Sequence, residues 1–268
     1  MNRRRYLALT GALTTTALAG CSESGETSTV DGGKTADPAS TDTETPAPTS
    51  GTENDVATER ATETETEPET ATPTGEAALE VISEELVVDE GEYSTDVYVA
   101  AEIENTADVP SGLIELKAEW FDGDGNYLDN STQYLRTLGA GETWNARVYA
   151  LMSDGEKIED YSLGGEFQTQ SPNFSPEGLA LGETELKVGD NDAVVNGGVQ
   201  NNRGEEVGYI QAIAKFYNAD GAVVGTGRDN VLEVPADRTW SFEASWLGYG
   251  DRLGDIDDFE VVITDSPY

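Results

Sequence analysis

The sequence predicts an all-β fold: two tandem β-sandwich repeats that follow an apolar leader and a long polar segment. Three observations support this prediction. From Leu79 onward, apolar and polar residues alternate with a period of two, which is typical of strands with one buried face. Landmark residues recur about 96 positions apart, and such a period suits a whole sandwich of ~100 residues. No 12-residue stretch of this region shows a convincing helical period.

The first twenty residues predict a signal peptide. Arg3, Arg4 and Arg5 precede an uncharged apolar stretch of 14 residues, 7–20, which ends in small residues. This stretch is shorter than the ~20 residues that a membrane-spanning helix needs. Adjacent Arg3 and Arg4, followed by an aromatic residue and Leu7, resemble the twin-arginine export signal. The alternative is an ordinary helix cap ahead of a domain.

Residues 18–21 read Leu-Ala-Gly-Cys and resemble a lipobox, after which the cysteine is lipidated and becomes the mature N-terminus. Cys21 is the only cysteine, so no intrachain disulfide can form, and an exported domain must be held together by its core alone. We therefore expect Cys21 to carry a lipid that anchors the protein on the extracellular face of the cell membrane.

A disordered tether is predicted for residues 21–76. Residues 22–75 contain no aromatic residue, but they contain 20 Ser or Thr, 13 Asp or Glu and five Pro. Such a segment buries too little apolar surface to offset the ordering of its backbone. Its composition fits either an O-glycosylated stalk or a bare acidic spacer.

The structured region is expected to divide into repeat 1, residues 77–169, and repeat 2, residues 177–268. Two prolines and two serines interrupt the strand pattern between Gln168 and Pro176. We expect the repeats to fold independently. A shift of 96 residues superposes Asn105 on Asn201, Ile114 on Ile210, Trp120-Phe121 on Phe216-Tyr217, Asp124-Gly125 on Asp220-Gly221, and Thr143-Trp144 on Thr239-Trp240.

These residues resemble a known family. An Asn turn leads to a strand that ends in two aromatic residues, Asp-Gly follows, and a Thr-Trp pair comes later. The pattern resembles the FxLYD domain, an immunoglobulin-like β-sandwich common in haloarchaeal lipoproteins, and the resemblance covers residues 79–264 as two copies. Repeat 1 departs from it after Gly125. The resemblance implies a fold and a location, and it carries over no catalytic residue.

The charge of the chain limits the classes of partner that it can bind. Asp and Glu total 53 against 15 Lys and Arg, so the formal net charge is −38. Nucleic acid is a poor partner for such a chain, because binding phosphates calls for clustered Lys and Arg. Acids run through the whole chain, which indicates adaptation to concentrated salt, where ions screen the repulsion between carboxylates. We expect the repeats to need molar salt to fold fully.

Little in the composition points to catalysis. Histidine is absent, which excludes His-based triads and His metal ligands. Paired carboxylates can hydrolyse glycosides, but among 53 acids some pair will lie at a suitable distance by chance. No cofactor is predicted.

Three groups of residues are candidate sites. Asp122, Asp124 and Asn126 resemble the start of a calcium loop, but position twelve is Gln133, so a plain Asp-Gly turn is favoured. Asn130 and Asn173 begin N-glycosylation sequons, the second followed by Pro176. The tryptophans that could stack on sugars share strand faces with apolar residues, which favours a core role; they are Trp144, Trp240 and Trp246.

The sequence identifies neither a ligand nor a reaction. It favours a non-catalytic, lipid-anchored surface protein of a halophile that binds or supports envelope proteins or glycans. The alternatives are a solute-binding lipoprotein that serves a transporter and a carboxylate-based hydrolase. Solute capture usually uses a cleft between two α/β lobes, and the sequence shows no alternation of strands with helices.

Overall fold

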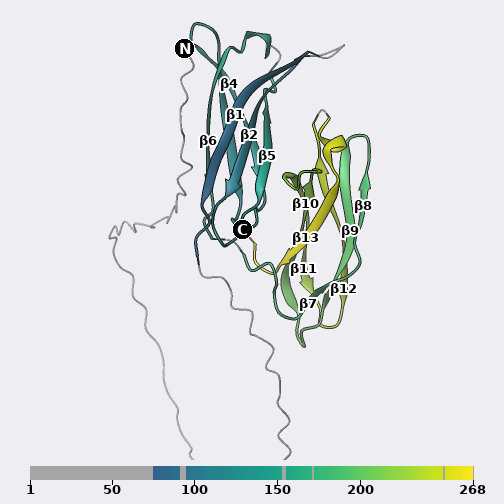
Figure 1. The fold of residues 1–268 in the computed structure, drawn as a ribbon. Coiled ribbons are helices and arrows are strands. Elements are labelled where there is room, and N and C mark those ends of the chain that lie inside the picture. Colours follow the sequence, from purple (N-terminus) through teal and green to yellow (C-terminus); the bar gives the residue numbers. More distant parts are fainter. Residues whose placement is uncertain (1–74, 91–94, 153–154, 171, 250, 268) are drawn as a thin grey trace, which may run out of the picture. The chain divides into compact units, whose positions relative to one another are not determined.

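The computed structural model describes residues 75–90, 95–152, 155–170, 172–249 and 251–267, and within them the protein is all-β (Figure 1). Repeat 1 contains β1 (Leu79–Glu90), β2 (Thr95–Asn105), β3 (Ile114–Phe121), β4 (Tyr127–Leu135), β5 (Thr143–Tyr149), the 3₁₀ turn η1 (Gly155–Lys157) and β6 (Asp160–Phe167). Repeat 2 contains β7 (Leu179–Leu181), β8 (Glu185–Val188), β9 (Asp192–Asn201), β10 (Val207–Tyr217), β11 (Val223–Val234), β12 (Thr239–Leu247), η2 (Arg252–Asp255) and β13 (Asp258–Thr264). The predicted sandwich class is confirmed.

The two repeats share one topology, except that repeat 2 has a β11–β12 bridge without a counterpart among the described pairings of repeat 1. In repeat 1, β2 pairs with β1 and β5, while β3 pairs with β4 and β6. In repeat 2, β9 pairs with β7, β8 and β12, while β10 pairs with β11 and β13. All of these pairings are antiparallel. The 96-residue shift found in the sequence therefore maps strand onto strand, with β7 and β8 together in the place of β1.

Alternation along the strands follows from burial of one sheet face. On β3, the four residues Ile114, Leu116, Ala118 and Trp120 are buried, and those between them are only half-buried. On β2, Val97, Val99, Ala101 and Ile103 are buried in the same way. Period-two alternation places these side chains on the inner faces of the two sheets, where they make the core of repeat 1.

Two hydrophobic cores form among the described residues. Trp120 and Trp144 lie in the first core, and Phe216 and Phe242 lie in the second. The second core contains residues of repeat 2 alone, whereas the first also contains Val223 from β11 of repeat 2. The described residues of both repeats belong to one compact unit. The division at 169 and 177, and independent folding, stay predictions.

The aromatic pairs precede matching turns. Asp122 Oδ1 accepts hydrogen bonds from the backbone N–H groups of Asp124 and Asn126, and in repeat 2 Asn218 Oδ1 accepts the equivalent bonds. Gly125 and Gly221 have φ values of 82° and 81°. Each turn follows a break in strand register, between Trp120 and Phe121 or between Phe216 and Tyr217.

Several predictions concern residues that the structure does not describe. The signal peptide with Arg3 and Arg4, the lipid anchor at Cys21 and all but the last two residues of the tether fall in residues 1–74. Within the described residues, no helix is long and apolar enough to cross a bilayer.

Candidate functional site: the junction between the repeats

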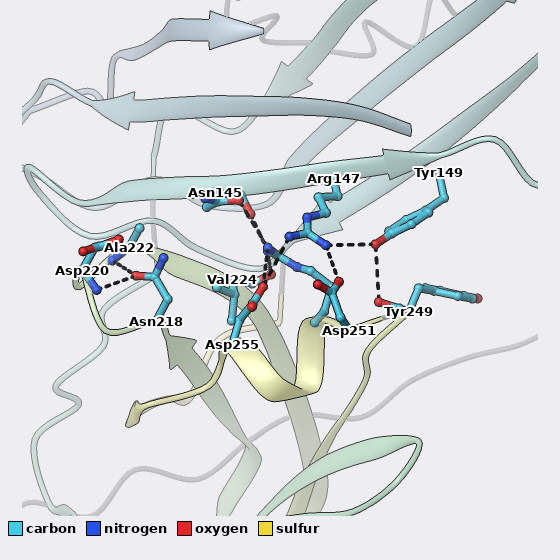
Figure 2. Close-up of polar contacts among 11 residues, drawn as sticks. Asn145, Arg147, Tyr149, Asn218, Asp220, Ala222, Val224, Tyr249, Asp251 and Asp255 are labelled. Atoms are coloured by element: carbon cyan, nitrogen blue, oxygen red, sulfur yellow. Dashed lines mark hydrogen bonds and ion pairs between the residues drawn. The ribbon is translucent and has the colours of Figure 1, made fainter. Parts of the chain in front are cut away.

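The outer face of β5 makes the junction between the repeats. Trp144, Ala146 and Val148 of β5 point into the first core, so the alternate positions point outward. Asn145, Arg147 and Tyr149 occupy these outward positions and contact repeat 2 (Figure 2). Their partners lie on and beside η2, the one-turn helix between β12 and β13.

Arg252 of η2 is the central cation of the junction. Its side chain is only 4% exposed. Its guanidinium donates to Asn145 Oδ1 at 3.2 Å and the Val224 carbonyl at 2.9 Å, and also to the Asn145 carbonyl. Asp255 lies 3.3 Å away. Burial, together with the charge of Arg147, lowers the pKa of Arg252. A buried cation is tolerated only when its donors are satisfied, and half of these acceptors belong to repeat 1.

Arg147 completes the ion cluster from the side of repeat 1. It pairs with Asp251 at 2.5 Å and Asp255 at 3.6 Å, and it donates to the Tyr149 hydroxyl. Burial works to lower the pKa of Arg147, but the hydrogen bonds to Tyr149 and Asp251 outweigh it and raise the pKa. Arg147 therefore holds carboxylates of the other repeat.

A second ion cluster crosses the junction. Lys215 of β10 has a side chain only 5% exposed, and its Nζ lies 2.8 Å from Glu142 of repeat 1 and 2.6 Å from Glu260 of β13. The Tyr217 hydroxyl lies within hydrogen-bonding distance of both carboxylates. Burial works to raise the pKa of Glu260, but Lys215 and Tyr217 lower it. The cluster thus holds one carboxylate from each repeat around one buried ammonium.

Backbone and apolar contacts add to the two ion clusters. Val223 and Trp144 form a single parallel β-bridge between β11 and β5. Val223 is fully buried in the first core. The backbone N–H of Arg136 donates to the Thr226 hydroxyl at 3.1 Å. Repeat 2 therefore supplies a small share of the core of repeat 1.

A row of tyrosines borders the junction. Tyr98 and Tyr149 lie opposite each other on β2 and β5, with ring centroids 4.9 Å apart, and Tyr249 lies 6.0 Å beyond Tyr149. The Arg147 guanidinium lies 5.1 Å from the centre of the Tyr98 ring. Tyr249 is 54% exposed and Leu247 67% exposed. We call Tyr98, Tyr149, Leu247 and Tyr249 the junction strip.

The cavity at the junction is small, and a larger hollow is lined by residues of repeat 2 alone. A cavity of about 20 Å³ lies between Arg147, Tyr149, Trp246 and Arg252, which is room for about one water molecule. A hollow of about 440 Å³ beside Arg203 is open to solvent. The Arg203 guanidinium there already binds Asp265 and the Glu177 carbonyl, each at 2.7 Å.

The candidate cation loop is a closed turn. Besides the backbone bonds to Oδ1, Asp122 Oδ2 accepts from the Asn126 side chain at 2.9 Å. These hydrogen bonds lower the pKa of Asp122. Within the described residues, no group of three or more acidic side chains is placed to hold a metal ion. The plain turn is the interpretation that the geometry supports.

Asn130 and Asn173 are both exposed. Asn130 lies on β4, at the edge of its sheet, and its amide donates to the Tyr127 hydroxyl. Asn173 lies in the segment between the repeats, where its side chain accepts a bond from the Ser175 N–H at 3.0 Å. The two sequons thus occupy different settings, a paired strand and a loop.

The three tryptophans considered for sugar stacking differ in how deeply they are buried. Trp144 is fully buried in the first core. Trp240 and Trp246 are half-buried and pack against the second core, and the Trp246 ring stacks on Phe216 with centroids 5.5 Å apart. The core interpretation of their strand faces is confirmed.

Sequence reasoning missed the ion clusters. Arg147, Lys215 and Arg252 lie on three different elements, and no local motif links them. One signal was present: repeats 1 and 2 contain only ten Lys and Arg among 39 acids. Since cations are so scarce, each Lys or Arg of the repeats was a candidate for a specific structural contact.

Comparisons with known proteins assign no family. No family model matches the chain, and neither does any curated protein. Solved structures with some likeness include a red sea bream transglutaminase, at 12% identity over 68% of this chain and 31% of that one, with a TM-score of 0.21. A Bacteroides uniformis β-glucuronidase matches at 13% identity over 64% of this chain and 28% of that one, with a TM-score of 0.19.

Tandem CBM22-1-CBM22-2 domains of Paenibacillus barcinonensis Xyn10C also match, at 11% identity over 72% of this chain and 89% of theirs, with a TM-score of 0.13. This chain spans less than a third of the transglutaminase and of the glucuronidase. Likenesses this weak carry no argument about function.

Proposed function

We propose that the protein is a non-catalytic module of a halophile, held on the extracellular face of the cell membrane by a lipid on Cys21. It binds or supports another component of the envelope, a protein or a glycan. The Arg3-Arg4 pair and the lipobox-like residues before Cys21 support export and anchoring. The composition of residues 22–75 supports a tether that lifts the repeats off the membrane.

The junction strip is the observation that supports binding. Tyr249 and Leu247 are both more than half exposed, and they adjoin Tyr149 at the meeting point of the two repeats. Aromatic side chains with a free polar end are frequent in binding surfaces because they combine apolar area with a hydrogen-bonding group. In a chain of net charge −38, the four side chains of the strip are uncharged, and the charges beside them, Arg147 and the exposed Asp251, pair with each other. A partner can therefore approach the strip with little carboxylate desolvation.

Envelope membranes offer a test of this surface. The double variant Leu247→Ser with Tyr249→Ser removes the exposed end of the junction strip. Leu232→Ser with Tyr127→Ser is a matched control, because those side chains are 65% and 53% exposed, against 67% and 54% in the strip. Pulldown in high salt, followed by mass spectrometry and glycan analysis, should lose the captured component with the first variant only. Equal capture by both variants would rule out the strip as the binding surface.

Solute capture and hydrolysis have less support. The cavity at the junction holds about 20 Å³, far below the 300–1,000 Å³ or so of a typical small-molecule site. The hollow of about 440 Å³ beside Arg203 is open to solvent, so it would not bury a solute. Burial raises the pKa of Glu84 on β1, as a general acid would need. Tyr161 lies beside Glu84, and burial together with the charges of Glu84, Asp160 and Glu85 raises the pKa of Tyr161 to about 12. A carboxylate mechanism also needs a cleft that holds the sugar between its two carboxyl groups, and Glu84 lines neither of the two cavities described above.

A further inference from the structure

Two strongly acidic bodies meet at the junction. Residues 77–169 contain 21 acidic and four basic residues, and residues 177–268 contain 18 acidic and six basic residues. Each repeat therefore carries a large negative charge of its own. Unscreened charges of one sign repel over tens of ångströms in dilute buffer, so the net charges of the two repeats drive them apart.

Three of those ten cations lie where the repeats touch. Arg147 reaches Asp251 across the junction, Arg252 reaches Asn145, and Lys215 reaches Glu142. Their side chains are 19%, 4% and 5% exposed. The carboxylates around them come from both repeats. Each repeat thus places at least one largely buried cation at the contact between the two acidic halves.

Salt acts differently on the two kinds of interaction. The Debye length falls from about 10 Å at 0.1 M to about 3 Å at 1 M, which removes repulsion between distant carboxylates. Charges in direct contact and partly buried are screened much less. Concentrated salt therefore weakens the long-range repulsion between the repeats, but it leaves the direct ionic contacts at the junction largely intact. An ordinary exposed salt bridge has the opposite dependence.

The contact is also small enough to open without unfolding either sandwich. It consists of the two ion clusters, one β-bridge, the Arg136–Thr226 hydrogen bond, the Tyr149–Tyr249 contact, and the packing of Val223 and Tyr217 against the first core. The second core contains residues of repeat 2 alone. Domains of one chain can move relative to each other unless the interface between them is large and hydrophobic. We propose that the junction is a salt-dependent joint, closed in molar salt and opened by dilution before the β-sandwiches unfold.

Spin labels can follow the joint in the full chain. Cys21→Ser frees the chain of its native thiol, and Thr95→Cys and Ser241→Cys place one exposed label on each repeat. Double electron–electron resonance should give a narrow distance distribution in 3 M KCl, and during stepwise dilution the distribution should broaden at a higher salt concentration than the one at which β-structure is lost. Far-UV circular dichroism at each salt concentration shows whether the β-structure is intact. A distribution that stays narrow or stays broad throughout, or broadens only when β-structure is lost, would overturn the proposal.

Arg252→Gln tests the buried cation. Removing one partner of a buried ionic contact should lower the closed-to-open ratio more than about 100-fold, which broadens the distribution even in 3 M KCl. Arg238→Gln is the matched control, because it removes the same charge from an exposed residue of repeat 2. The control should leave the distribution narrow. Equal broadening in both variants would show that net charge, and not the Arg252 contact, governs the joint.

Asp251→Asn tests the proposal independently, in case the Arg252 variant does not fold. The Asp251 side chain is 72% exposed, so its replacement leaves the cores untouched. It removes a negative charge, and a purely repulsive junction would therefore close more readily. Loss of the contact with Arg147 should instead lower the closed-to-open ratio about two- to fivefold and shift the opening to higher salt. A shift to lower salt would contradict the proposal.

Discussion

Asn105 and Asn201 are the residues that most directly link the repeat in sequence to the repeat in structure. Both are fully buried at the ends of equivalent strands, β2 and β9. The Asn105 amide donates to the carbonyls of Val109, Leu138 and Gly139. The Asn201 amide donates to the carbonyls of Glu205, Val234 and Pro235, which are the same positions 96 residues later. Each side chain thus ties two segments, through three carbonyl groups, to its core.

Replacing these asparagines should destabilise the repeats. Asn201→Ala leaves buried carbonyls without a donor, and we expect the free energy of unfolding to fall by about 2–4 kcal/mol. Asn105→Ala should have a similar effect. Urea denaturation in molar salt measures both, with Asn230→Ala on the exposed side of β11 as the control. Wild-type stability in the Asn201 variant would mean that the three bonds contribute nothing net.

At the scale of elements, each hairpin between the paired aromatics and the next strand depends on its glycine. Gly221 has a φ of 81° and open space where a Cβ would be. Only its backbone conformation therefore opposes a side chain there. Gly208, within β10, also has open space around it, but no positive φ.

Alanine at these two glycines should act in opposite directions. Gly221→Ala should cost about 1–2 kcal/mol, because L-residues rarely adopt a left-handed backbone. Gly208→Ala should add about 0.5–1 kcal/mol, because it removes freedom from the unfolded chain without strain. Thermal unfolding of both variants checks the difference. The same sign for both would show that local packing, rather than backbone conformation, decides the effect.

On the scale of the whole molecule, one sulfur atom is expected to decide where the protein resides. Cys21 is the only thiol in 268 residues and is the last residue of the lipobox-like sequence. A single buried hydrocarbon chain adds about 0.8 kcal/mol per CH₂, so stable anchoring needs more than one chain or a second attraction. The chain of net charge −38 offers no basic patch as that second attraction.

Cys21→Ser should therefore release the protein. We expect it to appear in the medium, or to stay unprocessed with its leader, whereas wild type sediments with the membranes. Fractionation in molar salt with an antibody against the repeats measures this, and Ser22→Ala is the control at the neighbouring position. A Cys21→Ser variant that is cleaved normally and still sediments would contradict the lipid anchor.

The sequence by itself determined the β-sandwich class, the strand faces and the turns, because these depend on interactions between near neighbours. Period-two alternation assigned Ile114 and Trp120 to the core, and the Asp-Gly pairs marked the hairpins. Because the pattern repeats after 96 residues, each assignment in repeat 1 is supported by the equivalent residues of repeat 2.

Only the tertiary structure decided which cations join the repeats and that Val223 of repeat 2 enters the core of repeat 1. Arg147 and Arg252 are 105 positions apart, and a residue's periodicity says which face it occupies but not what lies opposite. The physical reason is that burial of apolar area depends on local pattern, whereas an ion pair depends on the meeting of two distant surfaces.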